Sequence, residues 1–343
     1  MKDGKVGICL VGAGRAGLVH GRNYAHYIDR AQLVAVVDVN EQTAQAACRE
    51  LGARQAFTNV EQALERDDID AVVIVAPTRL HLPIALASAK AGKHIFCEKP
   101  MAMTEDECHK MNQAAEMNHV NLQIGFMRRF DASFLEAKQR IECGEIGDVV
   151  MVRSNTRGPS VPQPWMYDIQ TSNGPLAEVN SHDIDSLRWF TQSEFKTIYA
   201  VGGNYRCRSV ADAYPDFYDN VIVAATFANG MQGMIDGAQG VGYAYDARVE
   251  ILGSHGCIFL GRLHDHAIMT CTAESRYGSS PLVSSWRQLF RDAYLQEATE
   301  FVDCIFNQTP PRVTGHDGLM AVRVVNAGNR SIREKCVIDC LID

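Results

Sequence analysis

The chain has 343 residues, of which 46% are hydrophobic and 22% charged, and its formal net charge is −8. This length is sufficient for two domains, each with a core of its own. The acidic balance argues against nucleic acid or an anionic membrane as a partner. Because no apolar stretch reaches membrane-spanning length, we also expect no membrane insertion.

The N-terminus shows no cleavage-site pattern of a secretory signal peptide, since the first residues lead almost at once into an apolar run. The 11 cysteines are scattered and include no CxxC pair, which is typical of small buried residues in a reducing compartment. We therefore expect a cytoplasmic protein. No His, Cys and carboxylate cluster stands at ligand spacing, so no metal is expected.

Short runs rich in Val and Ile alternate with amphipathic helical stretches over residues 1–125. The expected strands are Val6–Val11, Leu33–Val37, Ala71–Val75, His94–Cys97 and Leu122–Gly125. The expected helices are Ala16–Ile28, Glu41–Leu51, Leu82–Ala91 and Glu105–Asn118. Continuous apolar strands joined by helical crossovers predict an α/β domain with a doubly wound parallel sheet, the Rossmann type that binds nucleotides.

Residues 126–343 follow a different pattern, which predicts a second domain of the α+β class with a largely antiparallel sheet. A helix is expected at Ala132–Cys143, and two more at Ala293–Phe306 and Asp317–Arg330. The strand-like runs between them are Val149–Asn155, Thr197–Tyr205, Asn220–Phe227, Met231–Gly237, Arg248–Leu252 and Cys257–Leu260. Asn229-Gly230 is a strong hairpin signal between two of these runs.

The first motif with chemical content is Gly12-Ala13-Gly14-Arg15-Ala16-Gly17, which follows a strand and opens a helix. Gly12 permits the tight turn, Gly14 lets the backbone approach a pyrophosphate, and Gly17 allows close packing of helix and strand. The N–H groups at the helix start then face negative charge, while Arg15 is placed to lie along a phosphate. The alternative is a strand–turn–helix without a ligand.

Asp38 ends the second expected strand, about 20 residues beyond the glycine loop. A carboxylate at this position accepts hydrogen bonds from the ribose hydroxyls and repels a 2′-phosphate. NAD is therefore expected in preference to NADP. The alternative is a surface aspartate.

Two further segments stand at the carboxyl ends of expected strands, where open α/β sheets bind ligands. In the first, Pro77, Thr78 and His81 are predicted cofactor contacts, although Thr78 is also a candidate helix cap. The second is Glu98-Lys99-Pro100, with Glu98 predicted on the cofactor side. Lys99 would donate a hydrogen bond or a proton to a substrate oxygen beside the nicotinamide.

Several segments closely resemble the glucose–fructose oxidoreductase and inositol dehydrogenase (Gfo/Idh/MocA) family. They are residues 76–81, 92–102, 124–131, 144–147 and 317–319, so the resemblance spans nearly the whole chain. It implies a nicotinamide-dependent oxidoreductase whose second domain has an open-faced sheet, often used for oligomer contacts. A homo-oligomer, dimer or tetramer, is expected on this ground. The segment 126–131 is most similar to inositol dehydrogenases.

The resemblance also implies a second catalytic element, an acid and a histidine four residues apart. His182 fits the histidine position, and Glu178 stands where the family usually has Asp. If one helix runs from Pro175 to Phe190, the two side chains share a face. They would then serve acid–base chemistry at one substrate carbon. The alternative is a buried histidine paired with a local carboxylate.

Four other residues are weaker candidates for binding a polyhydroxylated ring: Arg128, Asn155, Trp165 and Tyr243. Core packing or a subunit interface explains the aromatic residues equally well.

Together these features predict NAD-dependent oxidation of a secondary alcohol on an inositol or a pyranose sugar, with Lys99, His182 and Glu178 as the catalytic groups. The partner would be this small molecule. One alternative is a glycosidase of the same family that uses bound NAD, and another is a nucleotide-sensing protein without catalysis.

Overall fold

The computed structural model describes residues 4–265, 268–272, 274 and 278–341. The chain forms two compact units: unit 1 comprises Met1–Phe130 and Asp292–Val322, and unit 2 comprises Asp131–Arg291 and Arg323–Asp343. The sequence pattern predicted a single domain boundary, between residues 125 and 126. The structure differs because residues 292–322 return to the first unit.

Unit 1 is built on a six-stranded sheet in the order β3-β2-β1-β4-β5-β6, in which every neighbouring pair is parallel. Its strands are β1 (Val6–Val11), β2 (Ala31–Val37), β3 (Gln55–Phe57), β4 (Ala71–Ile74), β5 (His94–Glu98) and β6 (Leu122–Gly125). The predicted doubly wound parallel sheet is thereby confirmed. All residues of β1 and β4 are buried, as expected for a sheet covered on both faces.

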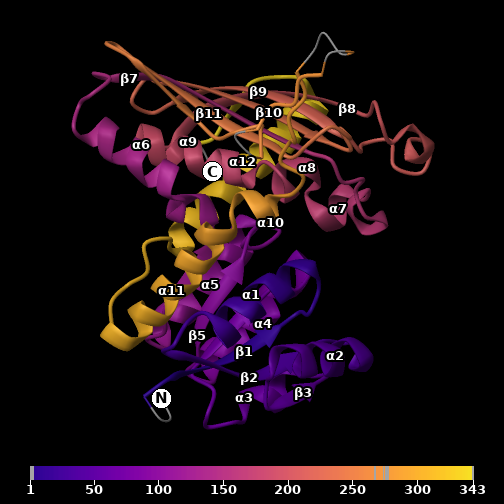
Figure 1. Cartoon of the computed structure of the whole chain (residues 1–343), viewed down its shortest axis with the longest axis vertical. Coiled ribbons are helices and arrows are strands. Elements are labelled where there is room, and N and C mark those ends of the chain that lie inside the picture. Colours follow the sequence, from indigo (N-terminus) through magenta and orange to yellow (C-terminus); the bar gives the residue numbers. More distant parts are fainter. Residues whose placement is uncertain (1–3, 266–267, 273, 275–277, 342–343) are drawn as a thin grey trace. The chain divides into compact units, whose positions relative to one another are not determined.

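The helices of unit 1 cover this sheet. They are α1 (Arg15–His26), α2 (Glu41–Leu51), α3 (Val60–Leu64), α4 (His81–Lys90), α5 (Glu105–Met117) and, apart from its first residue, α11 (Arg291–Asn307), with 3-10 turns η1 (Thr78–Leu80) and η2 (Met127–Phe130). The apolar side of α11, with Phe301, Val302 and Ile305, joins the core that contains Ile8 and Phe96. This burial explains why residues 292–322 belong to unit 1 (Figure 1).

Unit 2 is built on a seven-stranded sheet in the order β12-β11-β7-β10-β9-β8-β13. Its strands are β7 (Val149–Gly158), β8 (Phe195–Gly203), β9 (Asn220–Phe227), β10 (Gln232–Gln239), β11 (Asp246–Gly253), β12 (Cys257–Leu260) and β13 (Ile338–Asp339). The pair β7–β10 is parallel and the other neighbouring pairs are antiparallel, as predicted. The β9–β10 turn contains Gly230 with φ +87°, which fits the predicted hairpin.

The described helices of unit 2 lie on one face of its sheet. Figure 1 shows α6 (Ala132–Glu142), α8 (Gly174–Glu178) and α9 (Ser181–Thr191) on one side, and none of the described helices on the other. The remaining elements are α7 (Ile169–Ser172), α10 (Trp286–Leu289), the end of α12 (Gly315–Glu334), η3 (Pro164–Met166) and η4 (Arg208–Val210). Burial alternates along β9, whose outward residues are exposed. We call this uncovered side the open face.

Candidate active site

The glycine loop joins β1 to α1, and its three glycines are needed for different reasons. Gly12 has φ +96°, and a Cβ there would lie 2.4 Å from the carbonyl oxygen of Val75. A Cβ on Gly17 would lie 1.9 Å from the carbonyl oxygen of Gly12. Both glycines are therefore required by the fold itself.

Gly14 is different, because a Cβ on it would meet no atom within 4 Å and its φ of −72° suits any residue. It is exposed at the start of α1, and so is Arg15, whereas Ala16 is partly buried. Among the residues that the structure describes, no contact accounts for a glycine here. Close approach of a ligand to the backbone does account for it, which fits a pyrophosphate at the helix N-terminus.

Asp38 lies directly after β2, and its carboxylate closes onto the glycine loop. Oδ2 accepts a hydrogen bond from the backbone N–H of Ala13 at 3.0 Å, and Oδ1 accepts from the N–H of Asn40 at 3.0 Å. The side chain is partly exposed. Each carboxylate oxygen has two lone pairs, so capacity remains for ribose hydroxyls.

The segment after β4 places Pro77 at the surface and Thr78 in the interior. Thr78 begins η1 and caps no helix: α4 begins at His81, with Leu80 at its N-cap and no side-chain cap bond. The alternative of Thr78 as a cap is therefore wrong. The helix starts one residue earlier than predicted, but the 3-10 turn η1, which includes Thr78, precedes it and leaves Leu80 at the N-cap.

His81 is 1% exposed, and both ring nitrogens face backbone oxygens. Nδ1 lies 2.9 Å from the carbonyl oxygen of Pro100, and Nε2 lies 2.8 Å from that of Ala76. Burial lowers the pKa of this histidine. The structure thus uses the predicted cofactor contact to tie the end of β4 to the segment that follows β5.

Glu98 ends β5, is 7% exposed and points into unit 1 rather than toward a ligand surface. Its Oε1 lies 2.7 Å from His20 Nε2, and its Oε2 accepts the backbone N–H of Lys99 at 3.0 Å. Lys99 is partly buried, and the Lys99–Pro100 peptide bond is cis. The lysine therefore stands at the carboxyl end of the sheet with its backbone held by its neighbour.

Four predicted site elements each follow a strand of the unit 1 sheet. They are Gly12 after β1, Asp38 after β2, residues 77–81 after β4 and Lys99 after β5. In a parallel sheet these carboxyl ends share one edge, where the strand order reverses between β1 and β4. The structure thus brings the predicted cofactor loop, the ribose acid and the lysine to one edge of unit 1.

In unit 2, Glu178 and His182 lie on two helices instead of the single predicted one. Glu178 ends α8, and α9 begins at Ser181. Between them Asn180 directs its Nδ2 to Asp183 Oδ2 at 2.7 Å. The predicted common helical face is therefore wrong, because the chain breaks at Val179–Asn180. His182 is 6% exposed.

Asp183, next to His182, anchors the start of α9 to the sheet. It is 0% exposed and accepts hydrogen bonds from the hydroxyls of Ser154 and Thr156 on β7, the latter at 2.9 Å. Sequence reasoning gave Asp183 no role. The available signal was an alternating strand, β7, on which two hydroxyl residues share one side with a buried apolar residue.

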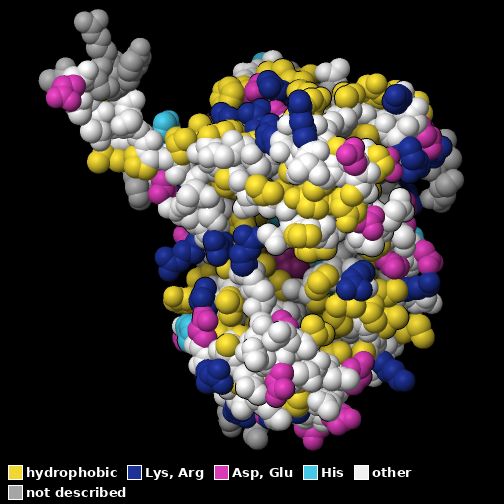
Figure 2. Space-filling view, turned by 90° about the vertical axis from the view of Figure 1, so that its right-hand side faces the viewer, with side chains coloured by type: hydrophobic (Ala, Val, Ile, Leu, Met, Phe, Trp, Pro, Cys, Tyr) yellow, Lys and Arg dark blue, Asp and Glu magenta, His cyan; other side chains and the backbone are white. Residues whose placement is uncertain are grey.

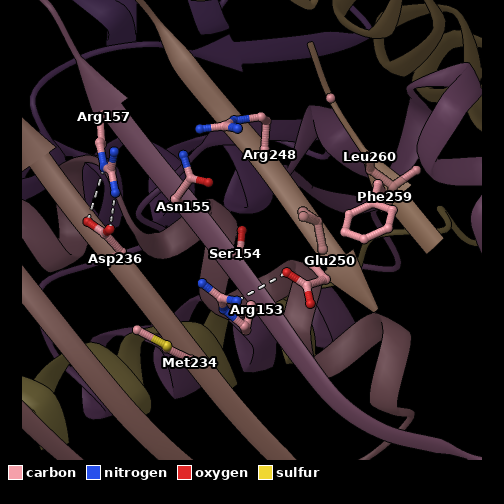
Figure 3. Close-up of a pocket in the computed structure, with 12 residues that line it drawn as sticks. Arg153, Ser154, Asn155, Arg157, Met234, Asp236, Arg248, Glu250, Phe259 and Leu260 are labelled. Carbon is pink, nitrogen blue, oxygen red and sulfur yellow. Dashed lines mark hydrogen bonds and ion pairs between the residues drawn. The ribbon is translucent and has the colours of Figure 1, made fainter. Parts of the chain in front are cut away.

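Asn155 lies between these hydroxyl residues on β7, so its side chain points to the opposite side, the open face. There it donates to the carbonyl oxygen of Asp246 at 3.2 Å, and Tyr243 donates its hydroxyl to Asp246 Oδ2 at 2.9 Å. Figure 3 shows Asn155 in a pocket of this face, near the ion pair of Arg157 with Asp236. The structure does not bring Asn155 or Tyr243 to the α9 side of the sheet.

Two other predicted substrate contacts are placed as follows. Arg128 lies in η2 and is 1% exposed. Trp165 lies in η3 and is 44% exposed. Neither position tests a substrate contact, and both stay predictions.

Known proteins match the chain along almost its whole length. The oxidoreductase family with an NAD-binding Rossmann fold matches residues 6–126, and the GFO/IDH/MocA C-terminal domain matches residues 134–259. The chain belongs to this oxidoreductase family. The expected family, fold class, enzyme class and cofactor NAD are thereby confirmed.

Curated relatives are similar over both units. A myo-inositol 2-dehydrogenase of Thermotoga maritima is 32% identical over 96% of this chain and 96% of its own. The scyllo-inositol 2-dehydrogenase (NAD(+)) of Bacillus subtilis is 32% identical over 96% of this chain and 94% of its own. A solved scyllo-inositol dehydrogenase of Lactobacillus casei, with bound NAD(H) and scyllo-inositol, has a TM-score of 0.89 and 26% identity, covering 98% of this chain and 100% of that one.

In the part of the chain that the structure describes, no helix combines the length and the apolar character needed to cross a membrane.

Proposed function

We propose that the chain oxidises one secondary hydroxyl of a cyclic polyol, an inositol or a pyranose sugar, with NAD as the oxidant. The observation that carries the proposal is the common sheet edge that holds the exposed Gly14, the Asp38 carboxylate and Lys99. The named activities of the inositol dehydrogenases similar to this chain support the polyol class.

The loop residues Gly12, Gly14, Arg15 and Gly17 would hold the pyrophosphate, and Asp38 the adenosine ribose. When bound, NAD supplies the acceptor for the hydride. The substrate loses a hydride from carbon and a proton from oxygen, and the C–O single bond becomes a carbonyl. The chain's own part is to bind the polyol and to take up that proton.

Lys99 would polarise the substrate oxygen through a hydrogen bond from its side chain. His182 or Lys99 would accept the hydroxyl proton, and Glu178 would orient His182 or bind a neighbouring hydroxyl. The anchoring of α9 by Asp183 supports a fixed position for His182 within unit 2. Arg128 and Trp165 are proposed as further substrate contacts.

We also propose that the chain acts as a homo-oligomer in the cytoplasm and that its open face forms the subunit contact. Tyr199 (40% exposed), Val201 (54%), Ile222 (50%) and Phe259 (76%) share this face with paired Arg and acidic residues. Figure 2 shows hydrophobic and basic side chains gathered at the top of the view, over the unit 2 sheet. An open sheet face with large exposed apolar residues is typical of an interaction surface. Sedimentation of the parent and of Phe259→Glu tests this, because a lower oligomeric state is expected only in the variant.

The activity is tested by incubating purified protein with NAD and a panel of inositols and common sugars while following reduced nicotinamide. The proposal expects one mole of NADH per mole of ketone formed from at least one inositol or pyranose sugar of the panel. Cleavage of a glycoside without net NADH would indicate the glycosidase alternative. Binding of NAD without any reaction would indicate a nucleotide sensor.

A further inference from the structure

Beneath Lys99, unit 1 contains a buried polar cluster that the proposed reaction does not use. It consists of His20 on α1, Glu98 at the end of β5 and Glu297 on α11, and these three residues are 0%, 7% and 0% exposed. One ring nitrogen of His20 and one carboxylate oxygen of each glutamate lie within 4.8 Å of one another. Burying such groups is costly unless they hydrogen-bond, so their arrangement requires a reason.

The ring of His20 is fixed in orientation by aromatic neighbours. Its centroid lies 5.0 Å from that of Phe96 and 5.4 Å from that of Tyr294, which meets it edge-on at 84°. Nε2 is thereby held at 2.7 Å from Glu98 Oε1. Because a carboxylate only accepts, the ring nitrogen is the donor in this contact.

Glu98 passes this constraint on to the lysine. Its second oxygen, Oε2, accepts the backbone N–H of Lys99 at 3.0 Å. On its other side the carboxylate packs against Gly125, where a Cβ would lie 3.0 Å from Glu98 Cδ. The carboxylate therefore has little room to move and connects the imidazole to the Lys99 backbone.

The segment after Lys99 is held independently by His81, whose Nδ1 lies 2.9 Å from the carbonyl oxygen of Pro100. Loss of the His20 contact would thus free only the Lys99 side of this segment. Small displacements of a catalytic group are costly, since about 1 Å can reduce a rate by about 10²-fold.

We propose that His20 is a positioning residue for Lys99: it holds the Glu98 carboxylate, and Glu98 holds the Lys99 backbone. This inference rests on the proposed catalytic role of Lys99. It also gives the helix that begins at the glycine loop a second task, because α1 carries both the first turn at Gly14 and the imidazole beneath the lysine.

Two variants of His20 separate positioning from packing. His20→Phe keeps an aromatic ring between Phe96 and Tyr294 but removes the donor to Glu98. His20→Gln removes the ring but places an amide N–H where Nε2 stands. If His20 positions Lys99, His20→Gln should be more active than His20→Phe. If His20 only packs against its neighbours, His20→Phe should be the more active variant.

The measurements are kcat and KM for the polyol, Kd for NAD, and hydrogen exchange of the peptide that contains the Lys99 amide. For His20→Phe we expect kcat to fall by about 10- to 100-fold with NAD affinity nearly unchanged, and the Lys99 amide to exchange faster. His20→Gln should retain both protection and most of kcat. Leu33→Ala, a buried change in β2 away from the cluster, is the control: it should lower stability without lowering kcat.

The inference is overturned if His20→Phe matches the parent in kcat and in exchange while Lys99→Ala has lost turnover. It is also overturned if a chelator abolishes parent activity and added Zn²⁺ restores it, because the cluster would then be a metal site. Activity of Lys99→Ala equal to that of the parent, or no oxidation of any polyol by the parent, would instead contradict the proposed function. The exchange data would still report whether His20 orders the Lys99 backbone.

Discussion

The carboxylate of Asp38 accepts the backbone N–H of Ala13 at 3.0 Å, so the acid that follows β2 is fastened to the loop that follows β1. This contact sets the position of a negative charge beside the proposed phosphate-binding loop before any ligand binds. A prearranged charge discriminates more sharply than a mobile one, because no ordering has to accompany binding.

Cofactor choice should follow from this charge. Asp38→Ser should lower kcat/KM for NAD by about 10- to 100-fold, the scale of a lost hydrogen bond to a charged group, while relaxing the rejection of NADP. Steady-state kinetics with both cofactors measure the effect. Asp29→Ser, at an exposed acid, should leave the preference unchanged. A parent enzyme that already prefers NADP would contradict the role given to Asp38.

The glycine loop offers a matched pair of substitutions. Gly14→Ala should fold normally, since its Cβ would meet no atom of the described residues within 4 Å. It should weaken NAD binding by about tenfold, because the added side chain lies where the ligand approaches the backbone. Gly17→Ala should destabilise the protein by about 1–3 kcal/mol, because its Cβ would meet the Gly12 carbonyl. Thermal unfolding and NAD titration of both variants check this. Normal NAD affinity in Gly14→Ala would remove the ligand explanation.

Glu178 departs from the residue usual in the family, and we expect its carboxylate to serve the substrate or His182. Glu178→Gln should keep NAD affinity and lower kcat by about 10²-fold or more, as for a group in acid–base catalysis. Glu178→Asp should retain more activity than Glu178→Gln if the negative charge matters most. It should retain less if the length of the side chain matters most. Unchanged turnover in both variants would leave Glu178 without a catalytic part.

Acid sensitivity should arise in part from His94. Its Nδ1 accepts the backbone N–H of Asn121 at 3.0 Å, and burial lowers the pKa of this histidine below its ordinary value. The unfolded chain therefore binds a proton below about pH 6.5 that the folded chain resists, and stability falls as the pH drops through that range.

His94→Asn keeps an acceptor for Asn121 but does not titrate. The loss of unfolding free energy between about pH 7.5 and about pH 5.5 should be smaller in this variant than in the parent. Chemical denaturation at the two pH values measures it, with His119→Asn at an exposed histidine as the control. If the unfolding free energy depends on pH equally in the parent and in His94→Asn, His94 does not contribute to the acid sensitivity.

Local sequence patterns were sufficient to predict most helices and strands of unit 1, the Rossmann unit. β1, α2 and β6 have the predicted bounds, because continuous apolar runs and the Asn40 cap define them without help from tertiary contacts. The short strand β3 was missed, since three partly exposed residues carry little hydrophobic signal. β3 forms through its parallel pairing with β2, a tertiary contact that its own sequence does not reveal.

Long-range packing decided the features that were not predicted. The return of α11 to unit 1 depends on partners such as Phe96, far away in the sequence. The inward direction of Glu98 depends on His20, 78 residues earlier. The break before α9 depends on Asp183 reaching β7. Asn155 is the exception, because its position could be predicted from the sequence. It lies on the same side of β7 as Arg153 and Arg157, so the alternation of side chains along the strand indicated the open face.

The most direct test of the central claim is turnover by Lys99→Ala at saturating NAD with the inositol that the parent oxidises. We predict that the variant binds NAD nearly as the parent does, judged by titration, while NADH formation falls by roughly 10²–10⁴-fold. Lys90→Ala, an exposed lysine at the end of α4, should retain parental turnover. Near-parental NADH formation by Lys99→Ala would contradict the account and leave Lys99 as a structural residue at the sheet edge.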